Sequence, residues 1–116
     1  MSEVLAAQEE TCRRYSVAPV APSGVEKLGI AIGSLEKLPL NALRHRPAPG
    51  MSGWYVWGGE ELSTDPGFFS PLHLSHIESY AAHLVPYLAL PPGWRVLLAP
   101  GQEDAWFDET LLEHEG

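Results

Sequence analysis

The chain has 116 residues and a mass of 12.7 kDa, which fits one domain that buries a core without disulfides or a metal. Seven Lys and Arg against fifteen Asp and Glu give a formal charge of −8, so direct binding to nucleic-acid phosphates is not expected. One cysteine excludes an internal disulfide and a cysteine-rich zinc site, and no apolar run approaches the ~20 residues that span a bilayer. The N-terminal stretch is charged and lacks the apolar core of a signal peptide, so we expect a cytoplasmic protein with no membrane partner.

Charge divides the chain into two unequal parts. Residues 1–46 hold six basic and five acidic side chains, whereas residues 47–116 hold one basic and ten acidic ones. The second part therefore builds the negative potential, which bears on the choice of partner rather than on the fold.

The first elements are a helix and a strand separated by a linker. Helical spacing of apolar residues predicts a helix over residues 2–16, and Pro19 and Pro22 in the stretch 18–24 prevent its continuation. We therefore expect an N-terminal helix at 1–17, a linker at 18–24 and one domain at 25–116. Whether the helix docks on the domain stays open. Residues 25–32 predict the first strand, and residues 39–50 are expected to be mostly irregular.

Residues 53–58, GWYVWG, form the clearest predicted strand because aromatic and β-branched residues suit a pleated surface. Trp54 and Val56 should point to one face, and Tyr55 and Trp57 to the other. Large side chains on both faces indicate a central strand that is covered on both sides. A loop with a turn at residues 65–67 should follow.

The remaining elements complete an α+β fold. Ser70 as N-cap and Pro71 at the first helical position predict a central helix at about 71–85. Residues 94–99 predict a strand, and residues 104–108 its hairpin partner. Leu111 and Leu112 are expected in a short tail helix that closes the core. The predicted architecture is a small, mainly antiparallel sheet packed by the central helix, with the N-terminal helix added.

Histidines and arginines offer two candidate binding groups. His73, His76 and His83 would share one stripe of the predicted helix, but no cysteine or acid completes a ligand set there, so no metal or cofactor is predicted. Arg44 and Arg46 flank His45 in a short basic cluster. This cluster either grips a carboxylate or phosphate, or lies in a solvated turn or a local ion pair with the acidic part of the chain.

No catalytic set is found among the remaining side chains. Adjacent carboxylates on a strand point to opposite faces, so the acidic pairs are not glycosidase dyads, and serine-elbow and phosphate-loop motifs do not occur. Cys12 is expected to be a buried thiol. Trp106, which lies among acidic neighbours, either anchors a protein interface or pairs across the hairpin with Trp94 or the neighbours of Trp94.

Several segments, in order, resemble the bacterial immunity proteins of polymorphic toxin systems, specifically immunity-protein family thirty-three, formerly a domain of unknown function. These segments are LRH at 43–45, GWYVW followed by GGE, FFSPLH, PYL before LPPGWR, and the closing EDAWFDE. The resemblance covers roughly residues 25–112 and does not extend to the N-terminal helix. It implies a protein that is not an enzyme and that binds and blocks a cognate toxin.

Acidity and the resemblance together predict a partner surface. An acidic inhibitor suits a basic toxin such as a nuclease, because complementary charge steers association. The predicted partner-binding residues are Glu60, Glu61, Glu103, Asp104, Trp106, Asp108 and Glu109. One alternative is a small-ligand or metal-binding domain that uses His73 and His76, with His45 as a further candidate. An enzyme built on Arg44, His45 and a distant carboxylate is a third. The toxin's activity and the oligomeric state are left open by the sequence.

Overall fold

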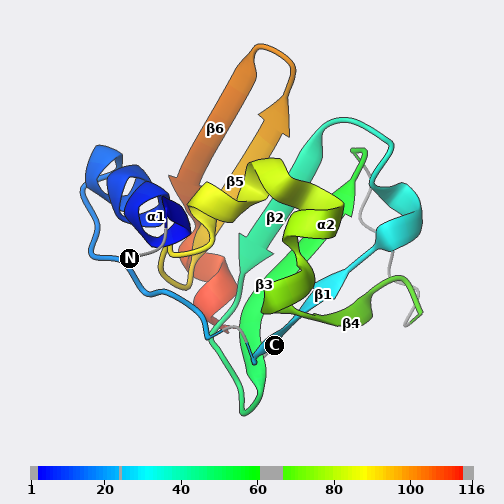
Figure 1. Ribbon diagram of the computed structural model, residues 1–116, viewed down its shortest axis with the longest axis horizontal. Helices are drawn as coiled ribbons and strands as arrows, with labels where there is room; N and C mark the ends of the chain where they lie inside the picture. Colours follow the sequence, from blue (N-terminus) through cyan, green and yellow to red (C-terminus); the bar gives the residue numbers. More distant parts are fainter. Residues whose placement is uncertain (1–2, 24, 61–66, 114–116) are drawn as a thin grey trace.

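The computed structural model describes residues 3–23, 25–60 and 67–113, and within these ranges it has two α-helices, six strands and four 3-10 turns (Figure 1). The helices are α1 (Glu3–Arg14) and α2 (Glu78–Ala81). The strands are β1 (Lys27–Ile30), β2 (Leu40–Arg44), β3 (Met51–Gly58), β4 (Ser70–His73), β5 (Trp94–Ala99) and β6 (Gln102–Phe107). The 3-10 turns are η1 (Ile32–Ser34), η2 (Leu74–His76), η3 (Ala82–Tyr87) and η4 (Glu109–Glu113).

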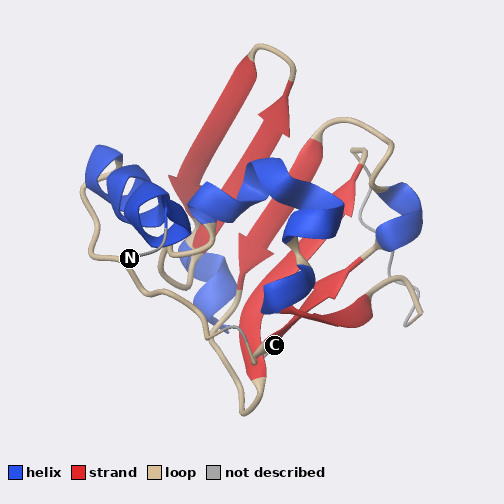
Figure 2. Ribbon diagram, in the orientation of Figure 1, coloured by secondary structure: helices blue, strands red, loops and turns tan. Residues whose placement is uncertain are grey.

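The strands form one sheet in the order β4-β1-β3-β2-β5-β6. Only the β1–β3 pair among them is parallel, and the other four pairs are antiparallel. Helix α2 and the turns η2 and η3 cover the face of the sheet that is turned to the viewer in Figure 2, whereas Leu111 of η4 belongs to a separate core cluster on the far face. The predicted fold class, an α+β domain with a mainly antiparallel sheet and an N-terminal helix, is confirmed.

Strand β3 is central, as its sequence predicts. Trp54 and Val56 are fully buried in the larger core cluster, which lies under the helices. Trp57 belongs to a second cluster on the opposite face, and Tyr55 packs against that cluster. Large side chains on alternating positions therefore fill both faces of the sheet, because successive side chains of a strand point in opposite directions.

Helix α1 docks on the domain. The side-chain amide of Gln8 donates a hydrogen bond of 3.0 Å to the carbonyl of Val85 in η3. The ring of Tyr15, just past the helix, meets the ring of Trp94 edge to face at a centroid distance of 5.6 Å. Cys12 is 1% exposed and belongs to the larger core cluster, which confirms the expected buried thiol. The helix thus contributes to the same core as the sheet.

The expectation that residues 39–50 are mostly irregular is wrong, because they contain β2. This strand pairs with β3 on one side and with β5 on the other. Its sequence, LNALR, lacks the β-branched and aromatic residues that mark a strand, and its conformation is imposed by ladders on both edges.

The start of the second helix also differs from the prediction. Ser70 and Pro71 lie in β4, which pairs antiparallel with β1 at the edge of the sheet. Proline is tolerated on an edge strand, so a Ser-Pro pair fits this position as well as a helix start. The helical part then runs from η2 through α2 to η3, where Pro86 lies inside the 3-10 turn.

Candidate functional site

The hairpin β5–β6 stands at one end of the sheet (Figure 1) and carries three of the seven predicted partner-binding residues, Glu103, Asp104 and Trp106. Gly101 in its turn has a φ of 75°, in the region that favours glycine. Trp94 lies opposite Phe107, Arg95 opposite Trp106 and Leu97 opposite Asp104. Strand β6 has no neighbour on its far side among the described strands.

One face of β6 combines an exposed indole with a carboxylate. Trp106 is 43% exposed, and its cross-strand neighbour is Arg95, the residue next to Trp94, so the structure contains the expected pairing across the hairpin and leaves part of the indole exposed. Asp104 is exposed two positions earlier on the same face, and it accepts a hydrogen bond of 3.1 Å from the side-chain amide of Gln102. An aromatic anchor beside a carboxylate is a combination found at protein interfaces.

The opposite face of β6 carries Glu103 and Phe107. Glu103 accepts a hydrogen bond of 2.9 Å from the guanidinium of Arg14 at the end of α1, and both side chains remain largely exposed. Phe107 is 51% exposed, and its ring lies 6.3 Å from that of Trp94. Sequence reasoning did not single out Phe107, although its place next to Trp106 on an edge strand was the available signal.

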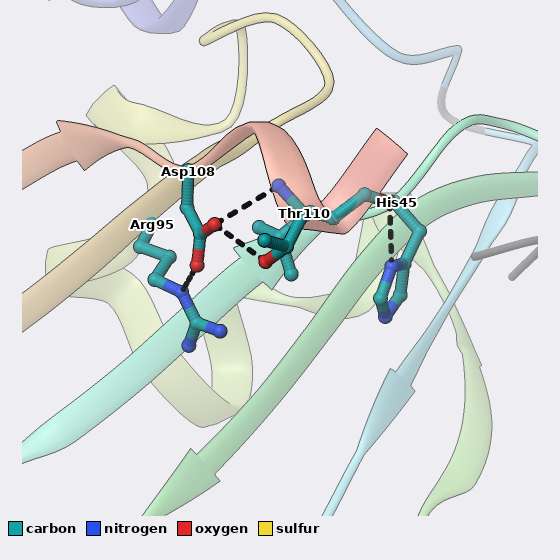
Figure 3. Close-up of polar contacts among 5 residues, drawn as sticks. His45, Arg95, Asp108 and Thr110 are labelled. Atoms are coloured by element: carbon teal, nitrogen blue, oxygen red, sulfur yellow. Dashed lines mark hydrogen bonds and ion pairs between the residues drawn. The ribbon is translucent and has the colours of Figure 1, made fainter. Parts of the chain in front are cut away.

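Asp108 serves the chain's own fold. Its carboxylate accepts a 2.7 Å hydrogen bond from Nε of Arg95 and further bonds from the main-chain N–H and the hydroxyl of Thr110 (Figure 3). The hydrogen bonds from Thr110, followed by those from Arg95, lower the pKa of Asp108 from 3.8 to about 2. Asp108 therefore links β5 to the start of η4, and it offers a partner less free charge than the sequence suggests.

The other predicted acids lie apart. Glu60 is exposed just beyond the end of β3, at the end of the sheet that also holds the β5–β6 turn. Glu109 is exposed at the start of η4, beyond the opposite end of β6. Glu61 lies outside the described residues. The structure thus brings Glu103, Asp104 and Trp106 together on one short strand and separates Glu60 from Glu109.

The three residues of the basic cluster at 44–46 each contact a different set of main-chain carbonyls within the chain. Arg44 is 2% exposed and donates to the carbonyls of Ser52, Val20 and Leu90 at 2.9, 2.7 and 2.9 Å. Nδ1 of His45 lies 3.1 Å from the carbonyl oxygen of Leu111, as Figure 3 shows.

Arg46 completes this use of the cluster, because its Nε donates a 2.7 Å hydrogen bond to the carbonyl of Leu112. His45 and Arg46 thereby hold the last carbonyls of η4, where cationic and donor side chains are favoured. His45 and Arg46 thus connect η4 to the sheet, and the whole basic cluster makes contacts within the chain.

The histidine stripe does not form. His73 lies in β4, His76 in η2 and His83 in η3, and all three are exposed. The rings of His73 and His76 meet edge to face at 6.0 Å. Among the described residues, no group of three or more His, Cys, Asp or Glu side chains is placed to hold a metal ion.

An apolar groove of about 570 Å³ opens between the turn before β2, the α2–η3 segment and the tip of β5–β6. Leu38, at its rim, is 60% exposed, and Tyr80 is 46% exposed. Polar groups reach it from His83 and Gln102. A groove of this size falls within the range of small-molecule sites, about 300–1,000 Å³.

The described residues form a small α+β domain built on one sheet, whose edge strand β6 carries exposed aromatic and acidic side chains. Residues 7–108 match the family described as the Imm33-like domain, so the chain belongs to this family. The match begins inside α1. The family's name marks an immunity-type protein, a class that is generally not enzymatic and that implies a cognate toxin as partner. No curated protein and no solved structure matches the chain. In the part of the chain that the structure describes, no helix has the length and apolar character needed to cross a membrane.

Proposed function

We propose that this protein neutralises a cognate bacterial toxin by binding it through an acidic surface centred on β6. Family membership carries the proposal, because an immunity-type domain implies a toxin. The exposed Trp106 supports the choice of surface, since a partly exposed indole on a rigid strand loses little freedom when a partner covers it.

Charge supports a basic toxin, with a nuclease as the leading class. The chain has a formal charge of −8, and Glu103 and Asp104 add carboxylates on both faces of β6. Opposite charge accelerates encounter, and this acceleration falls as salt rises. The exposed Glu60 and Glu109 extend the negative field to both ends of the sheet.

The proposal is tested by co-expression with the toxin domain encoded beside this protein's gene. We expect the immunity protein to restore growth and to form a one-to-one complex with that domain. Reversing the charge of both Glu103 and Asp104 to Lys should slow association and flatten its salt dependence. A matched control reverses Glu78 and Glu36, two exposed acids outside β6, and changes the net charge equally. Absence of rescue by the unmodified protein would refute the proposal.

Trp106→Ala separates the anchor from the charges. Because Trp106 is 43% exposed, its removal should change the free energy of unfolding by less than about 1 kcal/mol. Its loss from a buried interface centre should weaken toxin binding by roughly 2 kcal/mol or more, which is about thirtyfold. Equal binding by wild type and variant in titration calorimetry would remove Trp106 from the interface.

The apolar groove favours a second candidate function, the binding of a small apolar ligand. Its wall includes Leu40 and Leu98 from the sheet and Tyr87 from η3. A fluorescent apolar probe such as anilinonaphthalene sulfonate should bind there, and Leu38→Glu should abolish the signal without unfolding the protein. A probe signal unchanged by this substitution would dismiss the groove as a ligand site.

A further inference from the structure

We propose that β6 captures the toxin by strand addition, so that an extended cationic segment of the toxin becomes the seventh strand of the sheet. This inference rests on the proposed function and specifies its mode of recognition. Three observations carry it: the orientation of the main chain of β6, the different construction of the opposite sheet edge, and the side chains that flank β6.

The register determines which main-chain groups of β6 face outward. The N–H of Asp108 donates to the carbonyl of Gly93 at 2.6 Å, so the two residues occupy a hydrogen-bonded position of the ladder, although the N–H of Gly93 itself donates to Arg44. In an antiparallel ladder hydrogen-bonded pairs alternate with pairs that exchange no bond. Continuing the observed register, Trp106 and Asp104 bond to β5. The N–H and C=O groups of Glu103, Ala105 and Phe107 consequently point away from β5.

These outward groups are available for pairing. Strand β6 is the last strand of the sheet, and in the described ranges no main-chain hydrogen bond from another segment reaches Glu103, Ala105 or Phe107. They form a short row of donors and acceptors with the spacing that an added strand requires. Such a row is the usual basis of recognition by strand addition.

The other edge of the sheet, β4, is built differently. The N–H of Leu74 donates to the carbonyl of Glu26 at 2.9 Å, which sets the phase of the β1–β4 ladder. With Gly29 opposite Pro71, this phase turns the nitrogen of Pro71 outward, where it has no hydrogen to donate. Proline at an outward position is a common protection of a sheet edge, and β6 has no such residue.

The side chains of β6 indicate what pairs with it. Trp106 and Phe107 are 43% and 51% exposed on opposite faces, and an added strand would cover part of both. Glu103 and Asp104 also lie on opposite faces, so a segment with Lys or Arg at successive positions would meet a carboxylate on each face, at Glu103 in competition with the exposed ion pair to Arg14. A second copy of this chain is a poorer occupant, because each copy carries a formal charge of −8.

Hydrogen exchange followed by NMR tests the proposal on the full chain, with the neighbouring gene's toxin domain as the probe. In the free protein the amides of Glu103, Ala105 and Phe107 should exchange rapidly, whereas those of Asp104 and Trp106 should be protected. Addition of the toxin domain should protect the first three amides by at least about tenfold, the effect expected of a formed main-chain hydrogen bond. Tight binding without this protection would overturn strand addition while leaving the immunity function intact.

Ala105→Pro provides an independent test, because it removes one outward N–H and keeps the β5 ladder. Proline fits an edge position whose nitrogen faces outward, so the variant should fold, as circular dichroism would verify. Its affinity for the toxin domain should fall by about tenfold or more. The matched control Ala105→Val keeps the N–H and should bind within about threefold of wild type.

Equal affinities of the two variants would overturn the proposal. Amide protection that grows with the concentration of this protein alone would also overturn it, because it would indicate pairing between two copies of this chain. Failure of wild type to bind the toxin domain would instead refute the proposed function.

Discussion

Arg44→Met tests how a buried cation is accommodated in this fold. Arg44 lies in β2 and is 2% exposed, and its guanidinium carbon lies 5.6 Å from the ring centre of Trp54. In the described ranges it makes no ion pair with a carboxylate. Its partners are main-chain carbonyls, at 2.7 Å from Val20 and at 2.9 Å from Leu90 and Ser52. Methionine retains an unbranched apolar side chain but donates no hydrogen bond.

Two opposing terms set the size of the effect. Burial is the main cause that lowers the pKa of Arg44 from 12.5 to about 10, which corresponds to about 3 kcal/mol that methionine would recover. Hydrogen bonds from a charged donor contribute about 1.5–3 kcal/mol each, so the three short bonds contribute roughly 5–9 kcal/mol. The guanidinium of Arg44 also lies 3.5 Å from the carbonyl of Leu88, but this carbonyl keeps a 2.9 Å hydrogen bond from the indole of Trp54 when Arg44 is replaced. The difference predicts destabilisation by about 2–6 kcal/mol, a large share of the ~5–15 kcal/mol typical of a domain.

Urea unfolding measures this difference. The midpoint of Arg44→Met should shift strongly at an unchanged slope, since the surface exposed on unfolding is nearly the same. Arg46→Met is the matched control, because Arg46 is exposed and donates a hydrogen bond to the carbonyl of Leu112. We expect this variant to lose less than about 1.5 kcal/mol. Equal or higher stability of Arg44→Met would contradict this prediction and would show that the carbonyls are satisfied without the guanidinium.

Three further predictions concern single positions. The pKa of Asp108 is lowered from 3.8 to about 2, so the carboxylate stabilises the fold above pH 3.8 and this stabilisation is lost as the pH falls toward 2. The free energies of unfolding of wild type and Asp108→Asn should therefore converge between these two pH values. Cys12 is 1% exposed and burial raises the pKa of its thiol, so a thiol reagent should modify it only as fast as the protein opens or unfolds; rapid labelling of the native protein would contradict this. A Cβ at Gly58 would collide with the main-chain oxygen of Ser34, whereas a Cβ at Gly33 would meet open space. In urea unfolding, Gly58→Ala should therefore lower the free energy of unfolding by more than about 2 kcal/mol, and Gly33→Ala by less than about 1 kcal/mol. Similar losses in the two variants would argue against a close approach at Gly58.

Sequence reasoning identified the elements whose pattern is local. The alternation in β3 predicted burial on both faces, and strands at 94–99 and 104–108 were expected as the hairpin that the structure contains. It missed β2, because LNALR becomes a strand through ladders with β3 and β5. Ser70 and Pro71 were misassigned because a helix start and an edge strand both tolerate a proline that lacks an N–H.

The candidate site was predictable in part. The exposed Trp106 was expected as one of two alternatives, and its acidic neighbours were visible in the sequence. The internal use of Asp108 was not visible, because it depends on Arg95 from the facing strand and on the position of Thr110. From the sequence, Arg44 resembles a surface cation beside His45. Its burial was not predictable, because the carbonyls that accept its hydrogen bonds come from segments as distant as residue 90.

The strand order also determines when a newly made chain can fold. Strand β2 is complete at Arg44, but its second neighbour, β5, begins only at Trp94. At roughly 5–20 residues per second, several seconds of synthesis separate the two strands, and the interior edge of β2 waits unpaired during that time. The sheet therefore closes only when the last fifth of the chain is available. Chains terminated before the hairpin lack both β5, which closes the sheet, and the acidic edge strand β6. We therefore expect such chains to be degraded by proteases and not to bind a partner.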